Sequence, residues 1–428
     1  MISKIKIDYL VIWCTVLTTS LYVVANNLPI LLGSFRYLWA PLSIVVILLY
    51  RPRAFFIKPM RTLLIYGIVV VLLLPYTLWN MMDEWNSSAI LDEFYSLFIF
   101  VAIFNYYRIK RDYRNFALLG KSSFIFIIIT VLMSHIALFF DPYVIRNSAS
   151  ALSLNAYQEN IFKRTGAGGY GYMQALVCLL PILIYYIKSN QQVVLPRRLL
   201  IILLIAIFIL IVRAQVMANI LVAFLISSIS FVSLDKAKKS IIGIFFFCIV
   251  LISIPTSFYA DISTKLSSYF DNTSVIYERL NDFAMFIETP SIDTHPVTGT
   301  SEMVYRMERY PMLTRTFIEA PFFGAASLES SSYDLAGAHL YWMNRLTIWG
   351  ICGFSIFAFM LYQVYKSIRS LFDDSFGFYY TLSALAFIIL GLMKTIAGRE
   401  PFLMLIVVIP ALYFASQIQN NSKVNNTY

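Results

Sequence analysis

Three short segments of this chain place cations beside residues that could bind or transfer a charged group. The first runs from Phe162 to Tyr172 and sets Arg164 next to a run of four glycines that begins at Gly166. Glycine lets backbone N–H groups approach an anion closely, and a guanidinium offers a planar fork suited to phosphate. The segment therefore predicts an anion site at Arg164 and Gly166. The alternative is a turn whose glycines pack against a neighbouring helix.

The second segment, from Thr300 to Phe317, has a capping residue and helical apolar spacing, and it predicts a helix. Arg306 and Arg309 share one side of that helix, whereas Arg315 falls roughly opposite. A pair of arginines on one helix face could hold an anion. The plainer alternative, which the pattern alone favours, is a solvated basic face with neighbouring glutamates as partners.

Two isolated ionisable residues are further candidates. His339, one of three histidines, stands at the start of an apolar stretch, where a neutral imidazole could accept a proton from a hydroxyl. Arg213 interrupts an otherwise apolar stretch, and an ionisable group there is costly and is a functional candidate by default. The alternatives are a structural histidine and an arginine that snorkels to the membrane surface.

The composition defines what must position these residues. Of 428 residues, 59% are hydrophobic and only 13% are charged, whereas a soluble domain carries about 25% charge. The sequence thus predicts an all-α polytopic membrane protein, a single domain over residues 1–428 with about twelve spans. The predicted spans are 9–26, 37–50, 62–80, 90–105, 122–140, 171–187, 199–212, 215–233, 240–258, 340–363, 377–394 and 401–416.

The distribution of basic residues predicts the orientation. With the N-terminus inside, the cytoplasmic segments hold 20 of the 33 Lys and Arg residues, which favours cytoplasmic N- and C-termini. The formal charge of +10 then reports topology and requires no nucleic-acid partner. Two longer exterior segments remain, 141–170 and 259–338, and such insertions commonly carry function. The sequence has no metal-ligand spacing and no Walker loop, so no metal or cofactor is predicted.

Taken in order, these residues resemble the O-antigen polymerase and O-antigen ligase superfamily of bacterial membrane glycosyltransferases. The family pattern is an arginine, an aromatic residue, a Pro-x-x-Gly, then a histidine that opens the next span and two glycines within it. The matching residues here are Arg306, Tyr310 (where the family usually has Trp), Pro321, Gly324, His339, Gly350 and Gly353. Arg164, Gly166 and Arg213 match earlier elements, and the departures are Ala326, Leu340 and Ile348.

The resemblance implies transfer of a glycan from undecaprenyl pyrophosphate to a sugar hydroxyl at the periplasmic face of the bacterial inner membrane. It implies catalytic roles for His339 and Arg306. It assigns Arg164, Arg213, Arg309 and Gly166 to the pyrophosphate and donor sugar, and Tyr310, Tyr341 and Trp342 to sugar or lipid contacts. Membrane lipids and a chain-length regulator are the further partners implied.

Three activities stay open at this stage. The favoured one is a polymerase that joins repeat units of a surface polysaccharide. A ligase would use the same chemistry with lipid A–core as acceptor, and a lipid-linked oligosaccharide flippase is a rival from a different class. Transporters usually show internal repeats and charges within central spans, whereas this chain has an exterior segment of some 80 residues instead.

Overall fold

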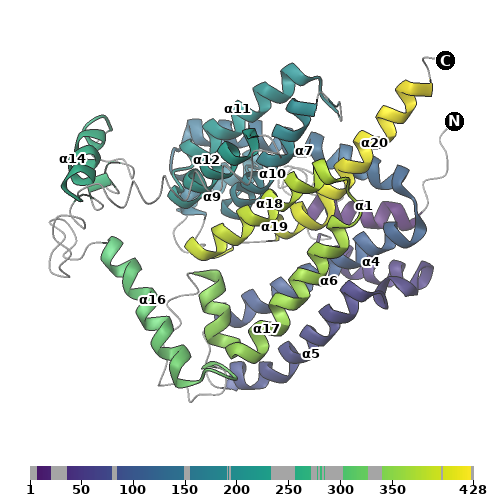
Figure 1. Ribbon diagram of the computed structural model, residues 1–428, viewed down its shortest axis with the longest axis horizontal. Coiled ribbons are helices and arrows are strands. Elements are labelled where there is room, and N and C mark those ends of the chain that lie inside the picture. Colours follow the sequence, from purple (N-terminus) through teal and green to yellow (C-terminus); the bar gives the residue numbers. More distant parts are fainter. Residues whose placement is uncertain are drawn as a thin grey trace. The chain divides into compact units, whose positions relative to one another are not determined.

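The computed structural model describes most of the chain as helix (Figure 1). The residues described are 7–20, 36–79, 84–148, 155–189, 191, 194–232, 256–270, 277, 280–281, 284, 302–325, 340–396 and 399–425. Helices and the short turns between them account for all of the regular structure in these ranges, as the apolar runs of the sequence predict.

Helices occupy the positions of eleven of the twelve predicted spans. They are α1 (Ile7–Ser20), α4 (Arg36–Tyr50), α5 (Lys58–Trp79), α6 (Glu84–Lys110), α7 (Tyr113–Phe140), α10 (Tyr170–Ser189), α11 (Arg197–Arg213), α12 (Met217–Phe231), α17 (Tyr341–Arg369), α18 (Asp374–Met393) and the consecutive α19 (Glu400–Leu403), η4 (Met404–Val408) and α20 (Ile409–Asn425). The predicted span 240–258 lies outside the described residues except for its last three, which begin α14 (Thr256–Ser267).

Six of the helical stretches in the described part are long and apolar enough to cross a membrane. They are Ile90–Lys110 of α6, all of α7, α10, α17 and α18, and Glu400–Gln419. Because a span needs about 20 residues, the shorter apolar helices α1, α4 and α12 do not meet this criterion alone. The chain is thus an α-helical membrane protein by its described helices, and the number twelve stays a prediction.

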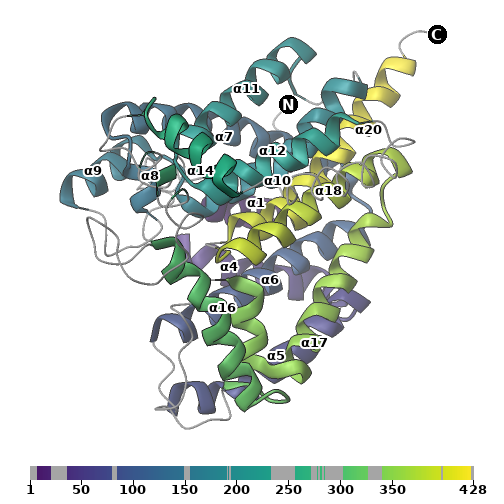
Figure 2. The same cartoon turned by 60° about the vertical axis from the view of Figure 1, so that its left-hand side comes forward.

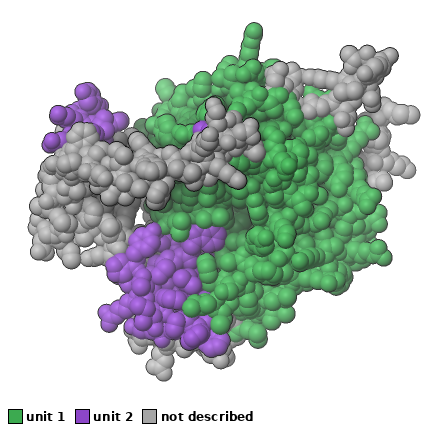
Figure 3. All heavy atoms as spheres, in the orientation of Figure 1, with its two compact units in different colours: residues 1–231, 351–428 green, residues 232–350 purple. Residues whose placement is uncertain are grey.

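The chain divides into two compact units (Figure 3). Unit 1 comprises residues 1–231 and 351–428, and unit 2 comprises residues 232–350. Unit 2 therefore contains the long exterior segment predicted at 259–338, together with the first turns of α17. The other predicted exterior segment, 141–170, belongs to unit 1 and contains two short helices, α8 (Val144–Asn147) and α9 (Ala156–Thr165).

Helix α10 forms the core of unit 1, with every residue from Tyr170 to Ile187 buried. It packs against α11, α12, α18 and α19 (Figure 2). Nearby, α7 lies along α20 at very short range, since a Cβ added at Gly120 would come within 2.7 Å of the carbonyl carbon of Ala411. Close backbone approach at small residues is the usual way membrane helices pack.

The last helix is widened over Met404–Val408, where the backbone is π-helical. The amide of Ile409 there bonds to the carbonyl of Met404, five residues back, and the following Pro410 has no N–H to continue the ordinary pattern. Tyr380 donates to the carbonyl of Leu405 at 3.3 Å. A neighbouring side chain thus satisfies a carbonyl that the widening leaves without its usual partner.

Candidate functional site

In unit 2, the turn after α16 (Glu302–Glu319) packs backbone to backbone against α17. A Cβ added at Gly324 would lie 2.2 Å from the carbonyl oxygen of Ile348, and one added at Gly350 would lie 2.4 Å from that of Phe322. Both glycines have positive φ, 76° and 61°, a region that disfavours other residues. The two glycines of the sequence pattern are therefore in direct contact, although 26 positions separate them in the sequence.

Gly350 also divides α17 into two helical segments. Its φ of 61° and ψ of −174° are not helical, so the residues before it form a separate short helix that begins at Tyr341. The residue preceding that helix, Leu340, also has positive φ, 63°, and is buried. Asparagine tolerates this conformation far better than leucine. Leucine in this conformation therefore places strain at the start of α17.

The short helix at the start of α17 carries a buried cation, Arg345. Its side chain is only 4% exposed, and its guanidinium carbon lies 5.0 Å from the centre of the Tyr341 ring, within cation–π range. Arg345 also donates from Nη1 to Oδ1 of Asn344 at 3.1 Å. The Tyr341 ring meets Trp342 edge to face at 4.8 Å. Of the predicted aromatic contacts, Tyr341 thus packs on a buried cation and Trp342 packs on Tyr341.

Helix α16 forms as predicted, and it packs on α17. The buried residues Leu313 and Thr316 mark the face turned to the rest of unit 2, and Thr347 of α17 donates to the carbonyl of Leu313 at 3.2 Å. Helical register puts positions 306 and 309 on this same face, two turns and one turn before Leu313 respectively. The side chains of Arg306 and Arg309 lie outside the described residues, as does His339.

The opposite side of α16 is open. Arg315 is 87% exposed and pairs with Glu319 at 3.7 Å, a surface ion pair of small energetic weight. Tyr310 is 46% exposed and borders a shallow surface depression with Pro311 and Ile318. The prediction that Arg315 lies away from positions 306 and 309 agrees with this arrangement.

The glycine segment of unit 1 is packed into the protein. Gly166 ends α9 with a φ of 65° and bonds to the carbonyl of Phe162, which is the usual role of a glycine after a helix. The amide of Gly168 donates to Oγ of Ser134 at 3.0 Å, and the Tyr172 ring fills the space a Cβ at Gly168 would need. These amides are bonded within the protein, so the anion prediction rests on the exposed side chain of Arg164.

Arg213 binds the end of α7. Its Nη2 donates to the carbonyl of Leu138 at 3.0 Å, in the last turn of that helix, where carbonyls lack helical partners. His135 of α7 contacts the carbonyl of Ala206 at 3.0 Å in the same helix pair. The Arg213 side chain is otherwise exposed, which fits the snorkelling alternative and leaves part of the guanidinium open to solvent or lipid.

Two sets of predicted residues thus emerge, one in each unit. In unit 1, Arg164 and Arg213 belong to helices that pack on α7, and Asp141 at the end of α7 accepts from Gln158 of α9 at 2.8 Å. In unit 2, Tyr341 and Trp342 belong to the same compact unit as α16. Arg345 was not among the predicted site residues, and its burial becomes visible only in the folded structure.

Comparisons of this chain with protein-family models, with curated proteins and with solved structures give no match. The helices described above define the class of protein, an α-helical membrane protein. Any more specific function must be argued from the chain's own residues.

Proposed function

We propose that this protein is a metal-independent membrane glycosyltransferase of the O-antigen polymerase type. It would join lipid-linked oligosaccharide repeat units of a surface polysaccharide at the periplasmic face of the bacterial inner membrane. The observation that carries the proposal is the contact between Gly324 and Gly350. It gives the ordered spacing of the sequence pattern a physical reason, since the turn after α16 and the start of α17 must fit together at two residues without side chains.

Stabilisation of the leaving group explains the need for arginines. In the proposed reaction, an acceptor hydroxyl oxygen bonds to the anomeric carbon of the donor, and the bond from that carbon to the pyrophosphate oxygen breaks. The lipid pyrophosphate leaves with the electron pair, so negative charge develops on its oxygens. Arg306 is the proposed partner of this charge, because a preorganised guanidinium stabilises it without a metal.

The proton of the acceptor hydroxyl goes to His339 in this proposal. His339 immediately precedes the strained Leu340 and lies six positions before Arg345. A neutral imidazole is the form able to accept a proton. Arg309, Tyr310, Tyr341 and Trp342 are the proposed contacts to the donor sugar or lipid in unit 2. Arg164, Gly166 and Arg213 are the candidates in unit 1.

The proposed orientation has both chain termini in the cytoplasm. In support, the described structure groups basic residues from three segments that the sequence predicts on that side, at 51–61, 108–121 and 366–369. A chain-length regulator is the proposed protein partner.

The decisive test uses purified protein with an undecaprenyl-pyrophosphate-linked repeat unit, and glycan length is read on a gel. Wild type should give a ladder of polymers, and Arg306→Ala and His339→Ala should reduce polymer formation at least about 100-fold. Arg315→Ala is the matched control, because Arg315 lies on the exposed side of the same helix. Ladders of wild-type yield from both site variants would refute the assignment.

Deletion in the native cell distinguishes the related activities. Loss of a polymerase leaves single repeat units on the lipid core, loss of a ligase leaves none, and loss of a flippase leaves lipid-linked units on the cytoplasmic side. Only the first outcome agrees with the proposal.

A further inference from the structure

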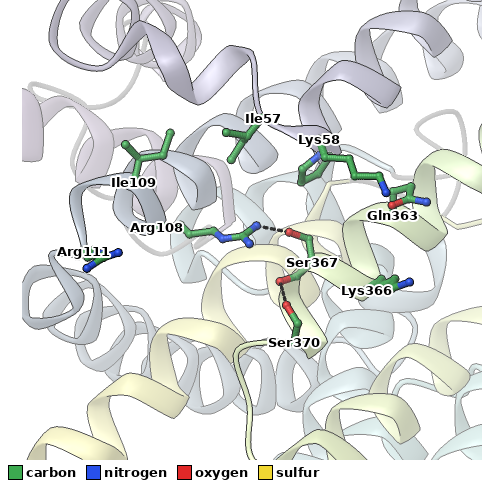
Figure 4. Close-up of a pocket in the computed structure, with 10 residues that line it drawn as sticks. Ile57, Lys58, Arg108, Ile109, Arg111, Gln363, Lys366, Ser367 and Ser370 are labelled. Atoms are coloured by element: carbon green, nitrogen blue, oxygen red, sulfur yellow. Dashed lines mark hydrogen bonds between the residues drawn. The ribbon is translucent and has the colours of Figure 1, made fainter.

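A basic cavity of about 510 Å³ lies in unit 1, where α6 and α17 end and α5 begins (Figure 4). Lys58 comes from the first turn of α5, Arg108 from the last turn of α6 and Lys366 from the last turn of α17. Arg111, in the turn that follows α6, adds a fourth cation. None of the side chains that line this cavity is acidic, so an anion would meet four positive charges there.

The four cations are available to a ligand. The ion pairs found within the described part of the chain include none of them. Lys58, Arg111 and Lys366 are exposed, and Arg108 bonds to the hydroxyl of Ser367, a neutral partner (Figure 4). A hydroxyl leaves the charge of a guanidinium uncompensated, so this bond orients Arg108 without neutralising it.

The position of the cavity along the helices indicates the source of the anion. Two of the helices, α6 and α17, are long and apolar enough to span a membrane, and the cavity lies at their final turns. Side chains at the ends of spans lie at the level of the lipid headgroups. A basic pocket at that depth between spanning helices is suited to a phosphate carried by a lipid.

The apolar surface next to the cavity suits acyl chains. On α17, Phe359 and Tyr362 precede Lys366 by seven and four residues, so the three share one face of the helix. Phe359 is 52% and Tyr362 is 51% exposed, and the Lys366 ammonium lies 5.9 Å from the Tyr362 ring centre. A lipid with its phosphate at Lys366 could therefore lay a chain along this face.

From these observations we infer that the cavity is a binding site for the headgroup of an anionic phospholipid, with Arg108 and Lys366 as the principal phosphate contacts. The C-terminal ends of α6 and α17 carry partial negative charge, which repels an anion in this cavity. The positive side chains must therefore supply the attraction. The site is independent of the proposed glycosyltransferase chemistry.

The test measures thermal stabilisation of detergent-purified, delipidated full-length protein by added lipid. Phosphatidylglycerol in mixed micelles should raise the melting temperature of wild type, whereas zwitterionic phosphatidylcholine should not. The double variant Lys58→Gln/Lys366→Gln should require about 30-fold more phosphatidylglycerol for the same shift, because two cations are lost. Arg108→Gln removes the half-buried cation that is held by Ser367. This variant should also require more phosphatidylglycerol than wild type for the same shift in melting temperature.

The matched control is Arg197→Gln/Arg198→Gln, which removes two exposed cations at the start of α11, away from the cavity. Its response to phosphatidylglycerol should equal that of wild type. An equal loss in the control would show a general charge effect and overturn the site. Stabilisation by inorganic phosphate or glycerol 1-phosphate equal to that by the lipid would overturn the lipid assignment. If neither the lipid nor the free phosphates stabilise the protein, the anion site itself is overturned.

Discussion

Gly324 and Gly350 touch through their backbones. A Cβ built on Gly324 falls 2.4 Å from the amide nitrogen of Gly350, and one built on Gly350 falls 2.6 Å from the amide nitrogen of Gly324. Neither residue can accept a side chain without moving the backbone of the other. The contact fixes the turn after α16 to the point where α17 changes direction, and thereby fixes the two segments of the proposed unit 2 site to each other.

Substitution at this contact should disrupt unit 2. For Gly350→Ala we expect a loss of about 3 kcal/mol in stability, because the positive φ costs about 1–2 kcal/mol and the overlap costs a similar amount. Thermal melting in detergent measures the loss, and the polymer assay should show lost activity. Cys352→Ala, at an exposed position two residues later, is the control. Melting of Gly350→Ala at the wild-type temperature would show that this contact does not exist.

Arg345 should matter for activity beyond its contribution to folding. Arg345→Met should reduce polymer yield about 100-fold, because a buried guanidinium in the proposed unit 2 site stabilises developing charge. Arg345→Lys should recover only part of the yield, since an ammonium lacks the planar fork that stacks on Tyr341. Yields are compared at equal amounts of folded protein, as judged by melting curves. Wild-type yield from Arg345→Met would contradict this role.

Asp112, in the turn between α6 and α7, should make stability depend on pH. Burial alone would raise the pKa of this carboxyl, but hydrogen bonds from Tyr9 and Asn115 and the charge of Lys110 together lower it below its ordinary value. Because the folded-state pKa is the lower one, the stabilisation is complete above the unfolded value of about 3.9 and is lost as the pH falls through the folded value.

Asp112→Asn tests this directly. The variant should melt below wild type at pH 7. The two melting temperatures should converge only as the pH falls below about 4 and through the lowered folded-state pKa, because wild-type Asp112 then also becomes uncharged. Asp374→Asn serves as control, because Asp374 is fully exposed in its pair with Arg369. A constant gap between Asp112→Asn and wild type at every pH would exclude titration of Asp112 as the cause.

Gln215 is expected to be replaceable by glycine with a gain in stability. It follows α11 with a φ of 55°, and its side-chain oxygen is buried without a hydrogen-bond partner. Gln215→Gly removes both costs and should raise stability by about 1 kcal/mol. Gln215→Ala removes only the second cost and should gain less. Among wild type and the two variants, Gln215→Gly should therefore have the highest melting temperature. A higher melting temperature for either of the other two proteins would show that the positive φ is not the dominant cost.

Hydrophobicity predicted the helices well, because a span must be apolar over its length and must end where polar residues gather. The predicted 171–187 and the observed Tyr170–Ser189 differ by only one or two residues. The sequence did not predict the π-helical widening at Met404–Val408, because the residues that widen the helix are as apolar as their neighbours. It also placed Asp141–Tyr170 as a polar exterior segment and missed the helix α9 within it.

Prediction of the site was less complete, because it depends on contacts between segments distant in sequence. The spacing of Gly324 and Gly350 can be read from the sequence, but their mutual contact can be seen only in the structure. The glycines after Arg164 have the composition of an anion cradle, yet the amide of Gly168 bonds to Ser134, 34 positions earlier. The sequence did not single out Arg345, because its burial and its contacts with Tyr341 and Asn344 arise only in the folded structure.

The complete burial of α10 has a consequence for how this protein is made. In the folded structure α10 meets other helices on all sides, so lipid contact cannot be the reason for its apolar composition. The helices that cover it include α18 and α19, which are synthesised about 200 residues later. During synthesis α10 must therefore reside in the bilayer without them. Its apolar sequence is a requirement of that transient stage, and polar substitutions in α10 should impair membrane insertion before they impair the finished fold.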